Sequence, residues 1–274
     1  MTPNVLSIAG VDPSGGAGIL ADLKAFSALG AYGTGVVAAL TAQNTRRVDE
    51  VQMVAPSFIA AQIDTLLADV RIDAVKIGML GNPQVVEAVA GRLAAHGVRR
   101  IVLDPVMVAK SGDRLLATEA VDALRRLLVP MASVLTPNLP EAADLLGEDE
   151  AGDVAAMRSM ARRLRALGPA IVVLKGGHLP GETCTDIVED GTRSIELASG
   201  RIATRNTHGT GCTLSAAIAA LLPRHADPVD AIREARAYLA AAIGAADKLR
   251  VGSGDGHGPV HHFHALWPVP RSAG

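Results

Sequence analysis

The chain alternates between short runs of apolar residues and longer stretches in which apolar residues recur at helical spacing. The short runs, each of which predicts a buried strand, are residues 4–9, 36–41, 74–77, 101–104, 133–136 and 171–175. The stretches with helical spacing are residues 18–29, 58–70 and 85–96. Strands that alternate with helices in this way predict an α/β fold, in which a mostly parallel sheet is covered by helices on both faces.

Two further short segments predict a β-hairpin in the second half of the chain. Residues 184–189 and 193–197 flank Asp190-Gly191, a pair that is typical of tight turns. We therefore expect one edge of the sheet to be antiparallel. No internal repeat and no low-complexity linker divides the sequence, so residues 1–274 are expected to form a single domain.

Composition and charge narrow the classes of partner. The 274 residues are 49% hydrophobic, which is enough for the core of a large α/β domain. With 26 basic and 28 acidic residues the net charge is −2, so the chain lacks the basic surface typical of nucleic-acid binding. No apolar run reaches the roughly 18 residues that span a bilayer, no signal-peptide pattern opens the chain, and two cysteines make neither a disulfide framework nor a metal cluster. We expect a cytoplasmic protein that binds neither nucleic acid nor membranes.

A glycine-rich loop runs into a long apolar helix at residues 206–213, Asn-Thr-His-Gly-Thr-Gly-Cys-Thr. The helix is expected to begin between Gly209 and Gly211. Its first turn leaves backbone N–H groups without partners, which favours a bound anion, and the glycines allow close approach. Cys212 stands at this helix start, where the pKa of a thiol falls below its usual value of about 8.5, and we interpret it as a base. The alternative is a tight turn before a core helix, with Cys212 a small buried residue.

Polar residues follow the predicted strands, at the edge where parallel sheets bind ligands. The glycine loop 10–18 follows the first strand, but its spacing matches neither a dinucleotide-binding loop nor a Walker A loop. Two interpretations of the loop 10–18 remain: it binds the substrate, or it is only a turn between a strand and a helix. Asp104 ends the fourth strand, Asn138 and Glu141 follow the fifth, and Lys175 ends the sixth. The ordered set indicates a binding site more strongly than any one member does.

These four residues suit a site for a phosphate and a divalent cation. Mg²⁺ keeps several waters and uses few carboxylates, so Asp104 and Glu141 are candidate ligands. The ammonium group of Lys175, on a buried aliphatic stem at a glycine turn, suits a phosphate. The structural alternatives are that Asp104 caps the next segment, that Asn138 begins a helix whose first turn holds Glu141, and that Lys175 forms a surface salt bridge.

Six ordered motifs that span the chain resemble those of one enzyme family. The motifs are Asp12–Gly18, Lys76–Leu80, Asp104–Met107, Thr136–Asn138, Lys175–His178 and Asn206–Cys212, and the tail Gly258–His264 adds a seventh likeness. They resemble the hydroxymethylpyrimidine/phosphomethylpyrimidine kinases of thiamine biosynthesis, which belong to the ribokinase superfamily. The resemblance implies a ribokinase-like three-layer α/β/α sandwich with a mostly parallel central sheet.

The resemblance also implies an activity. It is the ATP- and Mg²⁺-dependent phosphorylation of 4-amino-5-hydroxymethyl-2-methylpyrimidine to its monophosphate and then to its diphosphate, by a homodimer. The pyrimidine would be held by Gly10, Ala17, Gln43, Met79 and Val106. ATP would contact Lys175, Thr207, Thr210 and Arg236, and Mg²⁺ would be oriented by Asp104 and Glu141 with Asn138 nearby. The catalytic residues would be Lys175, Gly209, Gly211 and Cys212, with the backbone N–H groups of residues 209–212 forming an anion hole.

Some polar residues have more than one interpretation. The amide of Gln43 offers the donor and the acceptor that match an aminopyrimidine edge, or it caps the end of a strand. His208 acts on Cys212 or hydrogen-bonds the turn. The tail histidines His261, His262 and His264 lack companion ligands at a convincing spacing, so a capping tail near the nucleotide site is favoured over a metal cluster.

Two rival functions fit the same elements. A pyridoxal kinase would keep the fold and the cysteine but bind a different ring, and competition between pyridoxal and the pyrimidine separates the two. A nucleotide- or pyrimidine-binding regulator would be stabilised by its ligand without releasing ADP. The joint presence of Asp104, Glu141, Lys175 and Cys212 favours an enzyme.

Overall fold

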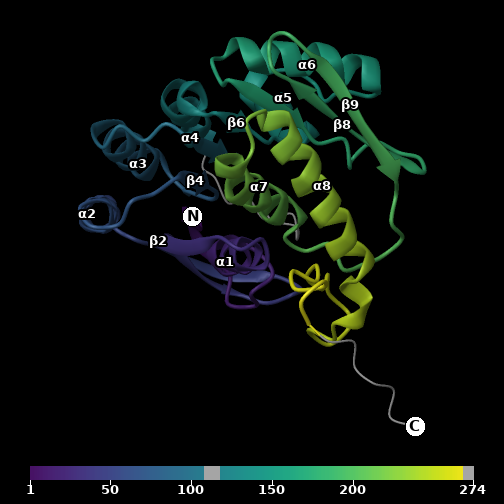
Figure 1. Cartoon of the computed structure of the whole chain (residues 1–274), viewed down its shortest axis with the longest axis horizontal. Coiled ribbons are helices and arrows are strands. Elements are labelled where there is room, and N and C mark those ends of the chain that lie inside the picture. Colours follow the sequence, from purple (N-terminus) through teal and green to yellow (C-terminus); the bar gives the residue numbers. More distant parts are fainter. Residues whose placement is uncertain (108–117, 268–274) are drawn as a thin grey trace.

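The computed structural model describes residues 1–107 and 118–267, and one sheet runs through them (Figure 1). Its nine strands lie in the order β3-β2-β1-β4-β5-β6-β7-β8-β9. They are β1 (Asn4–Val11), β2 (Tyr32–Gln43), β3 (Val48–Met53), β4 (Ala74–Ile77), β5 (Ile101–Leu103), β6 (Val134–Leu135), β7 (Ile171–Leu174), β8 (Thr183–Glu189) and β9 (Ser194–Gly200). In this spatial order the strands from β2 to β7 are parallel to their neighbours. The other three strands are antiparallel to their neighbours: β3 pairs with β2, β8 with β7 and β9 with β8. The predicted mostly parallel sheet is confirmed.

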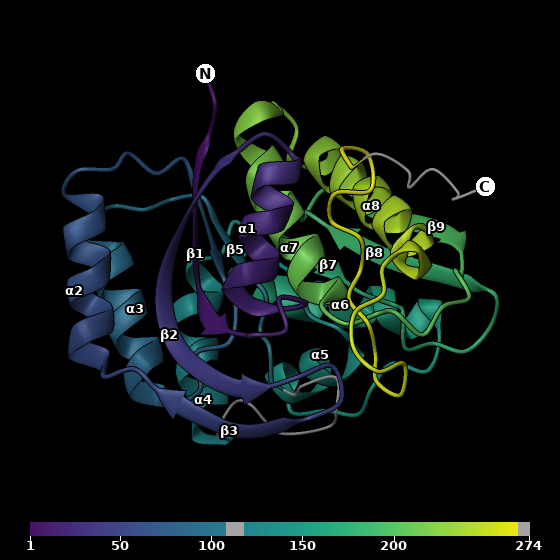
Figure 2. The same ribbon diagram turned by 90° about the horizontal axis from the view of Figure 1, so that it is seen from below.

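Helices cover both faces of the sheet. They are α1 (Gly18–Ala28), α2 (Pro56–Leu67), α3 (Pro83–Ala95), α4 (Thr118–Ala123), α5 (Leu139–Leu146), α6 (Val154–Ala166), α7 (Thr210–Leu221) and α8 (Pro228–Gly244). Shorter helical turns are η1 (Leu124–Leu128), η2 (Val129–Met131), η3 (Leu222–Arg224) and η4 (Ala246–Lys248). One apolar core joins α1, α7 and α8 to the sheet, and a second joins α2 to α6 to its other face (Figure 2). These layers make the α/β/α sandwich that the resemblance implied.

The predicted strands and helices are present, with small shifts at their ends, but the edges of the sheet differ from expectation. The hairpin formed by β8 and β9 makes one edge antiparallel, as predicted. The opposite edge is antiparallel too, because β3 pairs with an extended β2. The sequence of β3, Val-Asp-Glu-Val-Gln-Met, is mostly exposed. Burial therefore imposes no apolar pattern on it, and for this reason periodicity did not reveal it.

A buried ion pair ties the sheet to helix α1. Nζ of Lys76, on β4, donates to Oδ2 of Asp22, on α1, at 2.8 Å, and both side chains are fully buried. Oγ of Ser7, on β1, donates to the same oxygen at 2.6 Å. Lys76 belongs to a motif recognised in the sequence, but its partner Asp22 was not predicted. Loss of either charge would leave the other buried and unpaired, so the pair fixes how α1 sits on the sheet.

No helix within residues 1–107 and 118–267 combines the length and apolar character that a membrane span requires.

Candidate active site

Lys175 lies between two carboxylates at the carboxyl edge of the parallel strands. It directly follows β7, and its Nζ is 3.0 Å from Oδ1 of Asp104 and 3.7 Å from Oε2 of Glu141. Burial alone would lower the pKa of Lys175, but the two carboxylates raise it above its ordinary value. The ammonium is therefore charged. The sequence placed these three residues at strand ends, and the structure brings them together.

Asp104 and Glu141 are buried and differ in how well each is compensated. Oδ1 of Asp104 also accepts from Oγ1 of Thr136 at 3.1 Å, and Oδ2 accepts from Oγ of Ser215 at 3.3 Å. Burial works against ionisation of Asp104, yet Lys175 and Lys76 hold its pKa below the usual value. For Glu141, burial outweighs the attraction of Lys175 and raises the pKa to about 7.

Asn138 and Glu141 form a capping box at the start of α5. The N–H of Glu141 donates to Oδ1 of Asn138 at 2.9 Å, and the N–H of Asn138 donates to Oε2 of Glu141 at 2.8 Å. The helix start that the sequence offered as a structural alternative is therefore present. It also fixes the Glu141 carboxylate beside Lys175, so the two interpretations are compatible.

The predicted anion-binding turn is the start of α7. The helix begins at Thr210, and its N-cap residue Gly209 has a φ of 76°, a conformation that favours glycine. A Cβ at Gly209 would lie 1.7 Å from the carbonyl oxygen of Gly16, so the loop after β1 packs directly on this turn. A Cβ at Gly211 would lie 3.2 Å from Nζ of Lys175. The first turn of the helix and the ammonium group thus face the same small volume.

Cys212 stands in this first turn, but its thiol does not have the predicted acidity. Burial raises the pKa of Cys212 to about 11, although the nearby charge of Lys76 acts in the opposite direction. The expectation of a lowered pKa is wrong because desolvation of the thiolate outweighs the effect of the helix terminus. Cys212 is a free thiol that is protonated at neutral pH.

The loop after β1 is tied to the anion-binding turn through Asp12. Oδ2 of Asp12 accepts from Nε2 of His208 at 2.7 Å, from the N–H of Ala17 at 2.9 Å and from Oγ of Ser14 at 2.9 Å. Both Asp12 and His208 are buried. Of the two interpretations of His208, the structure supports a hydrogen bond that holds the turn, since its ring is engaged by Asp12.

The hydrogen bonds to Asp12 make its contribution to stability dependent on pH. Burial raises the pKa of Asp12, but the bonds from His208 and Ser14 bring it below the ordinary value. Its carboxylate therefore stabilises the fold above about pH 4, and this contribution is lost as the pH falls through the native pKa. We expect Asp12→Asn to lower the free energy of unfolding by about 1–3 kcal/mol at pH 7 in urea titrations, with a smaller difference at pH 3.

A matched control for this variant is Asp255→Asn. Asp255 is exposed and pairs with Arg46 only at 3.5 Å, so its replacement should leave the unfolding curve nearly unchanged at both pH values. A difference between wild type and Asp12→Asn that stayed constant from pH 7 to pH 3 would contradict the role given to the Asp12 carboxylate.

The residues expected to hold a pyrimidine come from strands β1 and β2, from the N-cap of α1 and from the segments that follow β4 and β5. Gly10 and Met79 are in contact, because a Cβ at Gly10 would lie 2.6 Å from Cε of Met79. Ala17 is the N-cap residue of α1. Val106 lies just past β5, and its N–H donates to the carbonyl oxygen of Asp104 at 2.8 Å. Oε1 of Gln43 accepts from Oγ1 of Thr41 at 3.1 Å at the end of β2, so both interpretations of Gln43 remain open.

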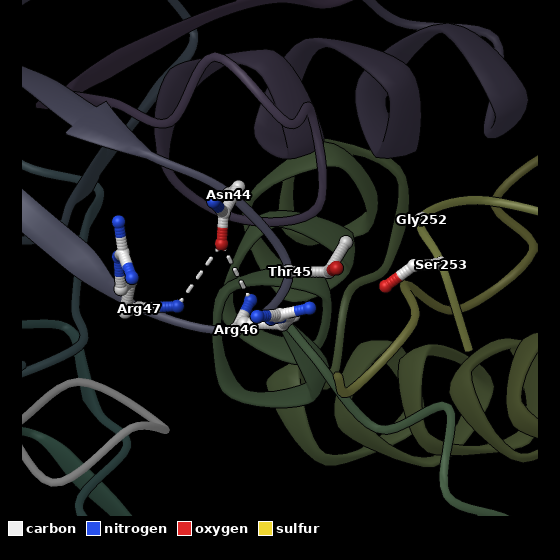
Figure 3. Close-up of a pocket in the computed structure, with 6 residues that line it drawn as sticks. All are labelled: Asn44, Thr45, Arg46, Arg47, Gly252 and Ser253. Atoms are coloured by element: carbon white, nitrogen blue, oxygen red, sulfur yellow. Dashed lines mark hydrogen bonds between the residues drawn. The ribbon is translucent and has the colours of Figure 1, made fainter. Parts of the chain in front are cut away.

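A surface pocket lies between the β2–β3 turn, which comes directly after Gln43, and the segment that contains Gly252 and Ser253. Figure 3 shows its lining residues, Asn44, Thr45, Arg46, Arg47, Gly252 and Ser253. Oδ1 of Asn44 accepts from the N–H groups of Arg46 and Arg47 and shapes the turn. The carbonyl oxygen of Thr45 accepts from the N–H of His257 at 3.0 Å. This pocket contains none of the residues that surround Lys175.

The remaining residues assigned to ATP divide into two groups. Oγ1 of Thr210 donates to the carbonyl oxygen of Thr207 at 3.1 Å, so both residues belong to the anion-binding turn. Arg236, on α8, instead contacts the β8–β9 hairpin. Its Nε donates to Oδ2 of Asp186 at 2.8 Å, and its Nη2 donates to the carbonyl oxygen of Cys184 and to Oγ of Ser199.

The C-terminal tail packs against the same turn. The N–H of His208 donates to the carbonyl oxygen of Gly258 at 3.0 Å, and Nε2 of His262 lies 3.0 Å from Oγ1 of Thr213, in the first turn of α7. Burial lowers the pKa of His262 to about 3, so this ring is neutral. Among residues 1–107 and 118–267, no group of three or more His, Cys, Asp or Glu side chains is placed to hold a metal ion.

Comparison with known proteins identifies the family. A family model described as phosphomethylpyrimidine kinase matches residues 12–261. The chain belongs to the phosphomethylpyrimidine kinase family. The chain is 54% identical to the hydroxymethylpyrimidine/phosphomethylpyrimidine kinase of Escherichia coli strain K12, over 96% of this chain and 98% of that protein. The family assignment based on the six sequence motifs is confirmed.

Solved structures of similar proteins agree with the fold. The phosphomethylpyrimidine kinase of Clostridium difficile 630 superposes with a TM-score of 0.78 at 38% identity, covering 88% of this chain and 100% of that chain. The pyridoxal kinase of Staphylococcus aureus in complex with AMP-PCP and pyridoxal gives a TM-score of 0.88 at 31% identity, covering 97% and 95%. The fold alone therefore does not choose between the two kinds of ring.

Proposed function

We propose that this protein is a bifunctional kinase that phosphorylates 4-amino-5-hydroxymethyl-2-methylpyrimidine to its monophosphate and then to its diphosphate, in the synthesis of thiamine diphosphate. The observation that carries the proposal is the position of Lys175, whose ammonium lies between two buried carboxylates and beside the first turn of α7. A cation next to the N–H groups at a helix N-terminus suits a phosphoryl group in transfer. The high identity to the E. coli kinase supports the choice of substrate.

In the proposed mechanism the protein mainly positions groups and stabilises charge. Lys175 binds the phosphates of ATP, with Thr207 and Thr210 shaping the turn around them. The N–H groups of Gly209 and Gly211 would face the negative charge that develops on the transferred phosphoryl group, and each such donor is worth about 3 kcal/mol in comparable anion holes. In the first step the proton of the substrate hydroxyl is accepted by the thiolate form of Cys212, which is a small fraction at neutral pH because burial raises the pKa of the thiol to about 11. In the second step the nucleophile is a phosphate oxygen that is already ionised, so no base is needed.

The donor set near Lys175 suits a magnesium ion. Asp104 and Glu141 already accommodate one cation, the Lys175 ammonium, and carboxylate oxygens are the ligands that Mg²⁺ prefers. We assign Asp104 and Glu141, with Asn138 beside them, to holding Mg²⁺ through water. The ion would supply charge neutralisation of the ATP phosphates.

Five residues are assigned to the pyrimidine. We propose that Gly10, Ala17, Gln43, Met79 and Val106 hold the pyrimidine, and that the Gln43 amide pairs with its aminopyrimidine edge. Arg236 is assigned to the nucleotide side of the site.

We also propose that the protein is a cytoplasmic homodimer. Strands β2 and β3 expose Tyr32, Leu40 and Val51, which are 63%, 51% and 39% exposed, and such side chains suit contact with a second copy of the chain. Sedimentation velocity decides the point, because a single species with the mass of one chain would refute the dimer. The cytoplasm is inferred from the supply of ATP there.

The function is tested by following products by mass over time. The purified protein is incubated with Mg²⁺-ATP and 4-amino-5-hydroxymethyl-2-methylpyrimidine, with pyridoxal in a parallel reaction. We expect the monophosphate to appear first and the diphosphate to follow. Phosphorylated pyridoxal alone would make the protein a pyridoxal kinase. No product from either compound would favour a binding protein.

A further inference from the structure

The loop that carries Lys175 into the site is held in place by charged side chains that lie outside the site. We call residues Lys175–Gly181, between β7 and β8, the Lys175 loop. The N–H of Lys175 donates to the carbonyl oxygen of Pro137 at 2.9 Å, which anchors the start of the loop to the segment after β6. Within the loop the N–H of Leu179 donates to the carbonyl oxygen of Gly176 at 3.0 Å, and side chains from other elements add further hydrogen bonds to the loop backbone.

The first of these side chains is Asp186, on β8. Its Oδ1 accepts from the N–H of Gly176 at 2.9 Å, and its Oδ2 accepts from Nε of Arg236 at 2.8 Å. Asp186 is only 7% exposed, so both bonds are shielded from water. A Cβ at Gly176 would lie 1.9 Å from the carbonyl oxygen of Thr185, which shows how closely the loop presses on β8. The residue next to Lys175 is therefore fixed through Asp186 to helix α8.

The second side chain is Arg201, just after β9. Its three guanidinium nitrogens donate to three carbonyl oxygens of the Lys175 loop. Nε donates to Gly181 at 2.8 Å, Nη1 to Gly177 at 2.9 Å and Nη2 to Leu179 at 2.6 Å. A guanidinium group presents its donors in one rigid plane, so three bonds from one group fix the curvature of the loop.

We propose that Asp186, Arg236 and Arg201 are positioning residues for nucleotide binding. They hold the Lys175 loop in the shape seen in this structure, so that binding of the ATP phosphates does not have to order it first. A preorganised loop raises affinity because this ordering cost is already met in the free protein. The proposal rests on the proposed role of Lys175 in binding ATP. In this proposal Arg236 acts on ATP indirectly, because the three hydrogen bonds described for its guanidinium group go to the β8–β9 hairpin.

An alternative role for the ion pair between Arg236 and Asp186 is only to dock the β8–β9 hairpin onto α8. The chain offers a control for that role. Arg193 lies at the β8–β9 turn and pairs with Asp227, the N-cap residue of α8, at 2.8 Å. It also pairs with Asp190 in the turn itself. Arg193 thus joins the same hairpin to the same helix but has no contact with the Lys175 loop among the described interactions.

The experiment compares Arg201→Gln, Asp186→Asn and Arg193→Gln with wild type. Arg201 is exposed, so its replacement should leave the fold intact. We expect Arg201→Gln to raise KM for ATP about tenfold and to leave KM for the pyrimidine within about twofold. Asp186→Asn keeps an acceptor for the N–H of Gly176 but loses the ionic partner of Arg236, so a smaller rise is expected. Arg193→Gln should change neither constant.

Amide hydrogen exchange tests the ordering of the loop directly. Peptides that contain residues 175–181 should exchange faster in Arg201→Gln than in wild type, while those from α7 should not change. An unchanged KM for ATP with unchanged exchange in the loop would overturn the proposal, as would an equal rise in both KM values or an equal effect of Arg193→Gln.

The design separates failure of this proposal from failure of the proposed function. Turnover by wild type with no selective effect of Arg201→Gln would leave the kinase function standing and refute the positioning role. Absence of turnover by wild type would refute the function. The positioning role would then be judged from the affinity for a non-hydrolysable ATP analogue, for which the same tenfold weakening in Arg201→Gln is expected.

Discussion

Replacement of Cys212 by alanine is expected to slow the first phosphorylation by about 100-fold or more and to leave the second nearly unchanged. General base catalysis contributes about 10²- to 10⁴-fold to reactions of this kind, and only the first step removes a proton from a hydroxyl group. The two steps are measured separately by starting one reaction with the pyrimidine and the other with its monophosphate. A first step that kept its rate in Cys212→Ala would exclude Cys212 as the base.

The raised pKa of Cys212 adds a pH dependence to this prediction. Because burial raises the pKa to about 11, the fraction of thiolate grows as the pH rises from 7 to 9. The rate of the first step should therefore increase with pH in wild type, and this dependence should be lost in Cys212→Ala. Cys184→Ala is the matched control, because Cys184 is the only other cysteine in the sequence and lies on β8.

The positions of the site residues could be predicted from the sequence because of where parallel strands end. Asp104 and Lys175 directly follow apolar runs, and the carboxyl ends of parallel strands meet at one edge of the sheet. The capping box could likewise be read from the local spacing of Asn138 and Glu141. Strand ends and helix caps depend on a few consecutive residues, so the local sequence is enough to predict them.

The energetics and the long-range partners could not be predicted in the same way. The acidity assigned to Cys212 followed a rule for helix termini and left out burial, which depends on the whole fold. His208 and Asp12 are 196 positions apart, and nothing in either segment indicates that they form a hydrogen bond. The same holds for Asp186 and Arg236, which are 50 positions apart. Strand β3 was missed for the opposite reason, because exposure removes the apolar pattern.

Replacement of Lys175 by methionine should have the largest effect on the protein, because it changes catalysis and stability together. Loss of a charge that stabilises a transferring phosphoryl group costs about 10²- to 10³-fold in kcat by analogy with anion-hole donors. The variant also leaves Asp104 and Glu141 buried without their shared cation. Removing one partner from a buried ionic cluster costs about 3–5 kcal/mol of stability.

The stability loss in Lys175→Met should grow with pH, and a second substitution can separate it from the catalytic loss. The pKa of Glu141 is about 7 even beside Lys175, and removal of the cation raises it further, so Glu141 can remain neutral at pH 6 but is increasingly forced to ionise at higher pH. The double variant Lys175→Met/Glu141→Gln removes this carboxylate and should recover part of the free energy of unfolding at pH 8. It should not recover kcat, because the Lys175 ammonium no longer faces the phosphates and Glu141, which is assigned to Mg²⁺, is lost as well. If activity returned with stability, Lys175 would be a structural residue that only neutralises its neighbours, and the phosphate-binding role would have to be given to the helix terminus alone.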